Sequence, residues 1–292
     1  MAIPLDLNVH SYYNSNECTW CDGCGDYGIM AASKRALVEL GIAPHEVALC
    51  FDIGCHGNTS DKMLGYRVHG LHGRIIPFAA GAALANPDMP VIAFGGDGAS
   101  FSEGVNHLVH GIRSHYPITF VLHNNANYGL TTGQASALTW QDQPMNTSPN
   151  GIPEDTIRSM DFLFSLQPTF VARSWSGDIA QMTRVMKAAI SHRGFAIVDI
   201  LQACPTYNKF ATHEWLLEHC FDANEEGHDP SDLEAAKKIA GDTSERVSCG
   251  ILYQTEDSPH FYERLKPREG KKTTAVDEVS ITDVSGLMKE FV

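Results

Sequence analysis

The chain has 292 residues, with 35 acidic and 21 basic side chains and a formal net charge of −14 when histidine is neutral. This charge argues against nucleic acid or an anionic membrane as a partner, because both surfaces would repel it. The eight cysteines are too few for a disulfide-stapled scaffold in a chain this long. We expect a cytoplasmic, reducing setting and no membrane, because the start lacks a signal peptide and no apolar run approaches roughly 18 residues.

The first candidate site is a cysteine pair that precedes a predicted helix. Cys21 and Cys24 form a C-x-x-C motif around Gly23, and Gly25 follows directly. Cys18 lies at the same spacing before this pair, so any two of the three cysteines could bind a metal. We favour Cys21 and Cys24, because the adjacent glycines permit the tight backbone that a metal-binding turn needs.

Five short apolar runs predict buried strands. They span residues 47–53, 91–94, 118–122, 170–172 and 196–201. Apolar residues with helical spacing fill 104–115 and 178–191, each between two of these strands. With right-handed crossovers, the strands extend one sheet. We therefore predict an α/β fold with a doubly wound parallel sheet.

The remaining segments carry weaker signals. Residues 132–161 are rich in Gln, Pro, Thr and Asn and predict a long loop, a kind of segment that is often functional. After about residue 224 the sequence becomes charged, with no core-forming period before residue 281. We expect residues 1–224 to form the folded domain and residues 225–292 to form an irregular C-terminal tail.

The ends of two neighbouring strands indicate magnesium and diphosphate chemistry. Asp97 lies in the glycine-rich turn Gly95–Gly98, and Asn125 follows it by 28 positions. Both residues fall at the carboxyl edge of the predicted sheet, where ligands bind in such folds. Carboxylate and amide oxygens suit Mg²⁺, and glycines let backbone N–H groups approach a diphosphate. The pair therefore predicts a site for a magnesium diphosphate.

Two further cysteines also follow predicted strands. Cys55 comes after the strand at 47–53, and Cys204 comes after the strand at 196–201. The same sheet edge can thus bring them to Cys21 and Cys24, beside the diphosphate site. A dispersed set of four thiolates is unlike a zinc ribbon, which favours a [4Fe–4S] cluster. The alternative is a zinc-stabilised α/β binding subunit without catalysis.

Several motifs in this order resemble the β subunit of 2-oxoacid:ferredoxin oxidoreductases, and most closely the two-subunit 2-oxoglutarate enzymes. The motifs are W-C-D-G-C-G-D-Y-G (20–28), D-I-G-C-H-G (52–57), H-G-L-H-G-R (69–74), G-G-D-G (95–98), Y-G-L-T-T-G-Q (128–134) and C-P-T-Y-N (204–208). The resemblance covers roughly residues 15–215. It implies a thiamine diphosphate (ThDP) binding fold of the diphosphate type.

The resemblance also implies the reaction and the partners. A 2-oxoacid is decarboxylated on ThDP, its electrons pass through a [4Fe–4S] cluster to ferredoxin, and coenzyme A (CoA) takes the acyl group in a reversible reaction. We expect 2-oxoglutarate as the substrate; pyruvate, branched-chain or indolepyruvate substrates are the alternatives. The chain holds only the diphosphate half of a ThDP site, so an α subunit must supply the pyrimidine half. We expect an obligate (αβ)₂ heterotetramer.

Residue roles follow from the same resemblance. Asp97 and Asn125 are the expected side-chain ligands of Mg²⁺, with the backbone oxygen of Asn127 as a third protein ligand. The expected cluster ligands are Cys21, Cys24, Cys55 and Cys204. The remaining cofactor-binding residues are Gly96, Gly98, Gly129, Leu130 and Thr131.

The loop from His69 to Arg74 is the local candidate for holding a carboxylate or the reacting oxygens. Arg74 offers a planar fork for a carboxylate, and His72 can donate to an oxyanion. His56 is a further candidate near the reacting carbon, because it is adjacent to Cys55. The alternative is that these histidines are loop residues bonded to backbone.

Overall fold

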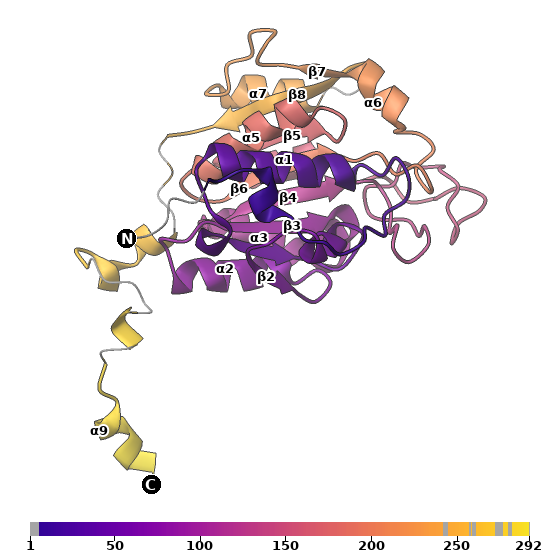
Figure 1. Ribbon diagram of the computed structural model, residues 1–292. Helices are drawn as coiled ribbons and strands as arrows, with labels where there is room; N and C mark the ends of the chain where they lie inside the picture. Colours follow the sequence, from indigo (N-terminus) through magenta and orange to yellow (C-terminus); the bar gives the residue numbers. More distant parts are fainter. Residues whose placement is uncertain are drawn as a thin grey trace.

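The computed structural model describes residues 6–241, 245–256, 258, 261–271, 277–279 and 282–291. In this part of the chain, eight strands form one sheet in the order β2-β1-β3-β4-β6-β5-β8-β7. The strands are β1 (Ala48–Phe51), β2 (Tyr66–His69), β3 (Val91–Gly96), β4 (Thr119–Asn124), β5 (Phe170–Trp175), β6 (Ala196–Leu201), β7 (Cys220–Asp222) and β8 (Val247–Gln254). Figure 1 shows the sheet through the middle of the molecule.

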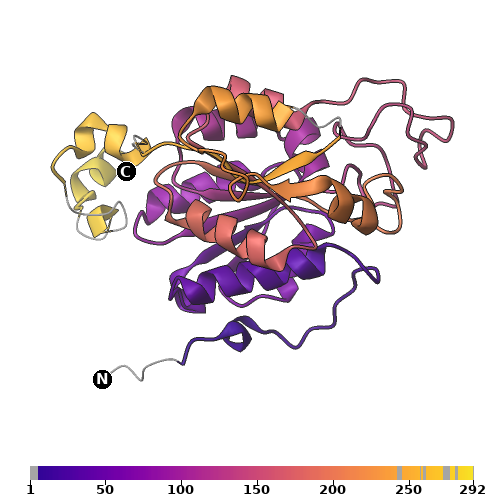
Figure 2. The ribbon, with the colours of Figure 1, turned by 90° about the horizontal axis from the view of Figure 1, so that it is seen from above.

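Helices cover both faces of this sheet, as the view from above makes clear (Figure 2). The helices with described bounds are α1 (Asp26–Glu39), α2 (Ile75–Ala85), α3 (Val105–Ser114), α4 (Ser159–Ser165), α5 (Ile179–Ser191), α6 (His213–His219), α7 (Leu233–Gly241) and α9 (Ser285–Met288), of which α9 lies away from the sheet. The five runs predicted as strands became β1, β3, β4, β5 and β6, and all of them run parallel. The predicted doubly wound α/β fold is confirmed, with β8 as an antiparallel addition next to β5.

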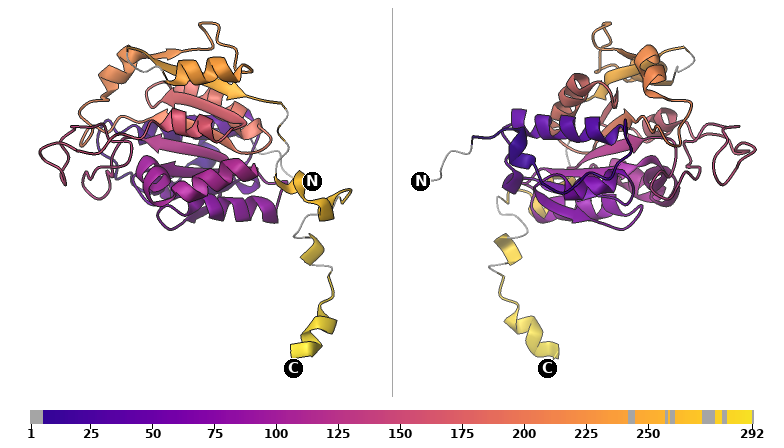
Figure 3. Two further views of the ribbon diagram at one scale, coloured as in Figure 1. Left: turned by 180° about the vertical axis from the view of Figure 1, so that it is seen from behind. Right: turned by 45° about the vertical axis from the view of Figure 1, so that its right-hand side comes forward.

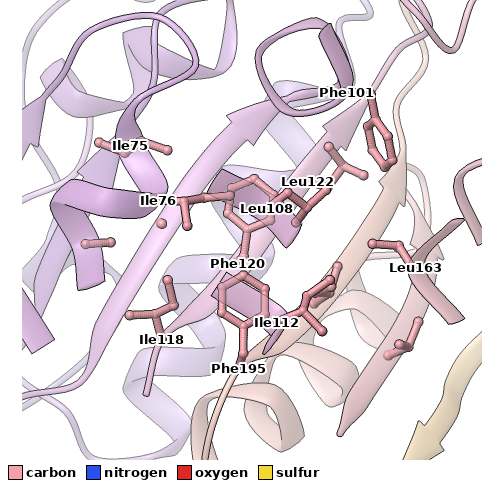
Figure 4. Close-up of a cluster of buried hydrophobic side chains, with 14 of the residues drawn as sticks. Ile75, Ile76, Phe101, Leu108, Ile112, Ile118, Phe120, Leu122, Leu163 and Phe195 are labelled. Carbon is pink, nitrogen blue, oxygen red and sulfur yellow. The ribbon is translucent and has the colours of Figure 1, made fainter. Parts of the chain in front are cut away.

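Each face of the sheet has its own apolar core. On one face, α2, α3, α4 and α7 pack on a cluster that contains Phe120 and Leu122 of β4. Figure 4 shows Phe120 in this cluster, with its ring 6.4 Å from that of Phe195. On the other face, α1 and α5 pack on a cluster that contains Phe94 and Val121. Because strand residues alternate between the two faces, continuous apolar strands such as β4 supply both cores.

The expectation that residues 225–292 form an irregular tail is wrong for the first part of this segment, which contains α7 and β8. β8 pairs with β5 from Phe170↔Gln254 to Arg173↔Gly250, and Leu252 of β8 is fully buried. Helix α7 packs over this strand, with Ala236 and Ala240 in the core. The apolar face of α7 is short and lies among charged residues, so the sequence pattern did not predict the helix. Strand β8 was not predicted because it pairs with a strand about 80 positions away. Residues 242–244 and several later ones lie outside the described residues.

The two ends of the chain differ in how closely they pack on the sheet domain. Near the N-terminus, Tyr12 is fully buried and its hydroxyl donates to Ile42 O at 2.7 Å. After β8, the described segments run away from the sheet toward the C-terminus (Figure 3), and Val284, Leu287 and Met288 are exposed there. Among the described residues, none of the helices combines the length and the apolar character that a membrane crossing requires.

Candidate functional site

Two neighbouring pockets lie where β1, β3, β4 and β6 end. The smaller has a volume of about 60 Å³ and is lined by residues that follow β1, β3 and β4. The larger, of about 280 Å³, is lined by four cysteines and the residues around them. We call them the diphosphate pocket and the cysteine pocket. Parallel strands present their carboxyl ends at one edge, which explains why segments far apart in sequence meet there.

Asp97 is the buried acid of the diphosphate pocket. The residue is 1% exposed, and Ser136 Oγ donates to its Oδ2. Its Oδ1 has no hydrogen-bond partner among the described residues. Burial raises the pKa of Asp97 to about 7, against the opposing effect of the Ser136 hydrogen bond. A buried carboxylate oxygen without a donor is what a cation ligand requires before the cation arrives.

Asn125 and Asn127 line the same pocket as Asp97 and are both buried. Asn125 Oδ1 accepts from Asn127 N at 3.1 Å, and Asn127 Nδ2 donates back to Asn125 O at 2.7 Å. Between them, Ala126 has a φ of 56°, a left-handed conformation that costs a non-glycine residue strain. Mutual hydrogen bonds keep this strained turn in place, so both amides stay at the pocket.

The predicted glycines also line this pocket, together with Leu130 and Thr131. Gly96 and Gly98 are required for close packing within the chain. A Cβ on Gly96 would lie 2.9 Å from the His56 ring, and one on Gly98 would lie 2.3 Å from the Tyr128 ring. Gly129 lies at both pockets, since a Cβ there would be 3.3 Å from Asn127 Oδ1 and 3.3 Å from Cys55 Sγ. The glycine-rich turn thus makes room for two rings that form the pocket wall.

The two predicted histidines both line the pocket. His56 is 5% exposed, and its Nε2 has no hydrogen-bond partner among the described residues. Burial, followed by neighbouring histidines, lowers the pKa of His56 well below its usual value, so its ring is neutral. His72 Nδ1 lies 3.4 Å from Glu103 Oε2, and Tyr128 donates its hydroxyl to the same carboxylate at 3.0 Å.

Arg74 does not join the pocket residues that the structure describes. Its Nη1 donates to Gly73 O at 3.0 Å and to Glu103 O at 2.8 Å, which turns the guanidinium toward backbone carbonyls. The expectation that it holds a carboxylate therefore lacks support in this chain. The loop is instead held by Asp52, whose buried Oδ1 accepts from Ile53 N at 2.7 Å and Gly73 N at 2.9 Å.

The cysteine pocket gathers Cys21, Cys24, Cys55 and Cys204, as the strand ends predicted. Trp20 Nε1 donates to Cys55 O at 2.7 Å and ties the C-x-x-C turn to the end of β1. Gly25 N donates to Ala203 O at 3.0 Å and ties the same turn to the residue before Cys204. One side-chain and one backbone hydrogen bond therefore hold the turn that carries Cys21 and Cys24 next to Cys55 and Cys204.

The thiols of this pocket influence one another. Burial raises the pKa of Cys55 to about 12, and Asp26, Cys204 and Cys21 add to the effect. Burial and Asp26 also raise the pKa of Cys24. Bound metal must therefore displace the protons of these thiols. In the described part of the chain, no three His, Cys, Asp or Glu side chains gather as a site for one metal ion.

The other four cysteines lie outside the described lining of this pocket. Cys18 lies near Tyr27, whose pKa it raises through a side-chain hydrogen bond. Cys50 is buried in β1 and belongs to the core, as its place in a strand suggests. Cys249 is also buried, against Trp175 and Leu216, and Cys220 packs beside it.

Cys55, Asn125, Gly129 and Leu130 line both pockets and form the wall between them. A buried polar pair lies close to this region: His123 Nδ1 is 2.7 Å from Asp26 Oδ1, and the His123 ring centroid is 5.3 Å from that of His56. Asp26 Oδ2 also accepts from Cys24 Sγ at 3.4 Å. The two pockets are thus in contact both at their wall and through buried side chains.

Sequence reasoning missed four side chains that organise the site: Asp52, Glu103, Ser136 and Gln202. Signals existed for two of them. Asp52 opens the D-I-G-C-H-G motif, and Ser136 lies in the long loop that starts beside the glycine-rich turn. Glu103 and Gln202 carry no local pattern, since their roles depend on distant partners.

Two family models match the chain. The one described as "Thiamine pyrophosphate enzyme, C-terminal TPP binding domain" matches residues 52–200, from the end of β1 into β6. Thiamine pyrophosphate is another name for ThDP. The other describes the C-terminal region of the pyruvate ferredoxin oxidoreductase beta subunit, and it matches residues 204–269, from Cys204 through β8. The first match therefore covers the predicted diphosphate motifs, and the second begins at the last predicted cluster ligand.

A curated relative decides the family. The 2-oxoacid:ferredoxin oxidoreductase 2, subunit beta, of Aeropyrum pernix is 40% identical over 259 residues, which cover 85% of this chain and 83% of the relative. The chain belongs to the 2-oxoacid:ferredoxin oxidoreductase β subunits. This β subunit is also 36% identical over 197 residues to the 2-oxoglutarate oxidoreductase subunit KorB of Mycobacterium tuberculosis, covering 68% of this chain and 53% of the relative.

A solved structure resembles the β subunit over nearly its whole length. It is a 2-oxoglutarate:ferredoxin oxidoreductase from Magnetococcus marinus with 2-oxoglutarate, coenzyme A and succinyl-CoA bound. The TM-score is 0.88 at 32% identity, with 98% of this chain and 96% of the other covered. The predicted family and fold are confirmed: the chain is a subunit of a 2-oxoacid oxidoreductase, has a ThDP-binding domain, and as a β subunit has an α subunit as its partner.

Proposed function

We propose that this β subunit serves a 2-oxoglutarate:ferredoxin oxidoreductase that holds Mg²⁺–ThDP in the diphosphate pocket and a [4Fe–4S] cluster in the cysteine pocket. The observation that carries the proposal is the shared wall of Cys55, Asn125, Gly129 and Leu130. A group bound in one pocket is then next to a group bound in the other. Such adjacency suits electron transfer without a relay.

The residues of the diphosphate pocket fit Mg²⁺ and a diphosphate. Asp97 supplies the buried carboxylate oxygen that lacks a donor among the described residues, and Asn125 Oδ1 has a second lone pair beyond the one used by Asn127 N. The backbone oxygen of Asn127 is the third proposed ligand, and Gly98, Gly129 and Thr131 line the path of the diphosphate. When bound, ThDP supplies the carbon nucleophile that permits loss of CO₂ from a 2-oxoacid.

The chain's own residues then shape the reaction space. His56 is neutral and buried, and its Nε2 at the pocket has no partner among the described residues, so it can offer one hydrogen bond to a reacting oxygen. His72 is partly exposed at the pocket and is oriented by Glu103. We assign both to contacts with the substrate. Arg74 is not assigned such a contact, because it binds backbone carbonyls.

The residues of the cysteine pocket fit an iron–sulfur cluster. Four thiols line a space of about 280 Å³, a volume suited to a group of several atoms. We assign Cys21, Cys24, Cys55 and Cys204 as its ligands. When bound, a [4Fe–4S] cluster accepts single electrons, and its potential depends on hydrogen bonds to its sulfurs.

The α subunit must complete the diphosphate pocket. In this chain the diphosphate pocket has a volume of about 60 Å³, far below the roughly 300–1,000 Å³ of pockets that enclose a cofactor. Leu130 lines this pocket and is 50% exposed. Leu71 precedes His72 in the sequence and is 77% exposed. We assign this apolar rim to the interface with the α subunit, in an (αβ)₂ assembly. Coverage by the partner would keep water away from the reacting carbon.

The substrate assignment rests on the solved relative that carries 2-oxoglutarate and succinyl-CoA. The test is to purify the β subunit with its α partner and to assay 2-oxoglutarate and pyruvate separately, each with CoA and a viologen acceptor. Efficient turnover of 2-oxoglutarate, with kcat/KM at least about 100-fold above that for pyruvate, would support the proposal. A preference for pyruvate would assign the complex to another 2-oxoacid, and failure to reduce the acceptor would refute the redox function.

A further inference from the structure

Gln202 lines the cysteine pocket and contacts Asn125, which lines both pockets. It follows β6 directly, is 2% exposed and lies two positions before Cys204. Its backbone N–H donates to Asn124 O at 2.8 Å, which extends the pairing of β6 with β4 by one residue. Its side chain reaches the cysteine pocket. Burying this long polar side chain requires that both ends of its amide have partners.

The two ends of the Gln202 amide have different partners, one in each site. Nε2 donates to Cys24 Sγ at 3.5 Å, and Oε1 accepts from Asn125 Nδ2 at 3.3 Å. One planar group therefore connects a proposed cluster ligand with a proposed Mg²⁺ ligand. The turn that carries Cys24 leaves space for this arrangement, because a Cβ on Gly25 would lie 2.8 Å from Gln202 Cγ.

Each of these hydrogen bonds has a separate physical effect. A donor to a cysteine sulfur stabilises the more negative, reduced state of a cluster and so raises its potential. An acceptor for Asn125 Nδ2 fixes the orientation of that amide and keeps its Oδ1 on the pocket side. Partners that orient a metal ligand in this way typically change metal affinity by about 10- to 100-fold.

We propose that Gln202 is a positioning residue that tunes the cluster through Cys24 and orients Asn125 for Mg²⁺ at the same time. The inference rests on the proposed function, because it concerns the groups assigned to the two pockets. A residue that only filled space would affect neither the cluster potential nor the Mg²⁺ affinity in a directed way.

The experiment uses the purified αβ complex with three substitutions. Gln202→Leu removes both hydrogen bonds, and Gln202→Glu keeps an acceptor for Asn125 but loses the donor to Cys24. Gln181→Leu is the matched control, since Gln181 is a buried glutamine of α5 whose Oε1 accepts from Ser174 Oγ at 2.8 Å. The cluster potential is measured by redox titration followed by electron paramagnetic resonance. Mg²⁺ affinity is measured by titrating metal-free complex in excess ThDP.

We expect Gln202→Leu to lower the potential and to weaken Mg²⁺ binding about 10-fold or more. Gln202→Glu should lower the potential while Mg²⁺ affinity stays within about 3-fold of wild type, and the control should change neither. The inference is overturned if Gln202→Leu matches wild type in both measurements or if the control shifts equally. If the Gln202→Leu complex assembles no cluster, the Gln202→Glu complex decides, and a cluster potential equal to that of wild type in this variant overturns the inference. Wild-type complex without a cluster would instead refute the proposed function.

Discussion

The cysteine pocket and the diphosphate pocket share a wall but differ in how much of each this chain provides. The cysteine pocket has about 280 Å³ and four thiols, all from one chain. The diphosphate pocket has about 60 Å³, although hydrogen bonds from Asn127 N and Ser136 Oγ already hold Asn125 and Asp97 in place. Under the proposed function, one subunit carries a whole site for the electron acceptor and half a site for the cofactor that generates the electrons.

This difference has a physical basis. Four thiols can be brought together by a single turn that is tied to two strand ends, which needs only contacts within the domain. A large cofactor with a diphosphate at one end and a ring at the other needs walls on several sides. A sheet edge offers only one of them, so the rest must come from another domain. We therefore expect catalysis to depend on assembly and cluster binding to be independent of it.

The largest expected effect is loss of the cluster from Cys204→Ala. Removal of one of four ligands should bleach the broad absorption near ~400 nm and abolish acceptor reduction. Cys18→Ala is the control, because Cys18 lies outside the described lining of the pocket. Iron analysis and absorption of both variants check the prediction. A full cluster in Cys204→Ala together with its loss in Cys18→Ala would mean that the ligand set is wrong.

The expected difference between the complete cysteine pocket and the incomplete diphosphate pocket is tested by expressing this chain without its α subunit. We expect the isolated β subunit to bind iron and sulfide but to retain no ThDP after gel filtration and to show no turnover. Cofactor content and activity, measured before and after addition of the α subunit, check both halves of the prediction. An isolated chain that holds ThDP and oxidises 2-oxoglutarate would show that the diphosphate pocket is complete by itself.

A smaller effect is expected from Asp97→Ala in the complex. Loss of a carboxylate ligand should weaken Mg²⁺-dependent ThDP binding by about 100-fold, while iron content stays normal. Asp88→Ala provides a control at an acid that follows α2, away from the pocket lining. Calorimetric titration with ThDP and Mg²⁺ measures the effect. Equal affinity in Asp97→Ala and wild type would remove Asp97 from the metal site.

The smallest effect concerns Ser136→Ala. The hydroxyl donates to Asp97 Oδ2, so its loss frees the carboxylate to rotate and should weaken Mg²⁺ binding about 10-fold. Ser165→Ala is the control, because its hydroxyl donates to Phe162 O at 2.7 Å at the exposed end of α4. The same titration applies. An effect as large as that of Asp97→Ala would indicate that Ser136 contacts the cofactor directly.

Much of the fold could be predicted because it is encoded locally. Continuous apolar runs gave the central strands, and the polar residues after them gave the sheet edge that binds ligands. Strand β8 could not be predicted, since its apolar residues lie in a charged region and become a strand only by pairing with β5. The carboxylate role expected for Arg74 lacks support for a related reason: its residue type suits a carboxylate, but Glu103 O and Gly73 O hold it elsewhere.

The sequence by itself determined which chemical groups are present and near which strand ends they lie, because both follow from residue type and short-range periodicity. It therefore predicted Asp97, Asn125 and the four cysteines as site residues. The tertiary structure agrees with the preference for Cys21 and Cys24 over Cys18, since it places Cys21 and Cys24, and not Cys18, in the described lining of the cysteine pocket. It alone also revealed the contacts of Gln202, whose partners Cys24 and Asn125 are 178 and 77 positions away. Side-chain direction depends on such distant contacts, and local sequence does not contain them.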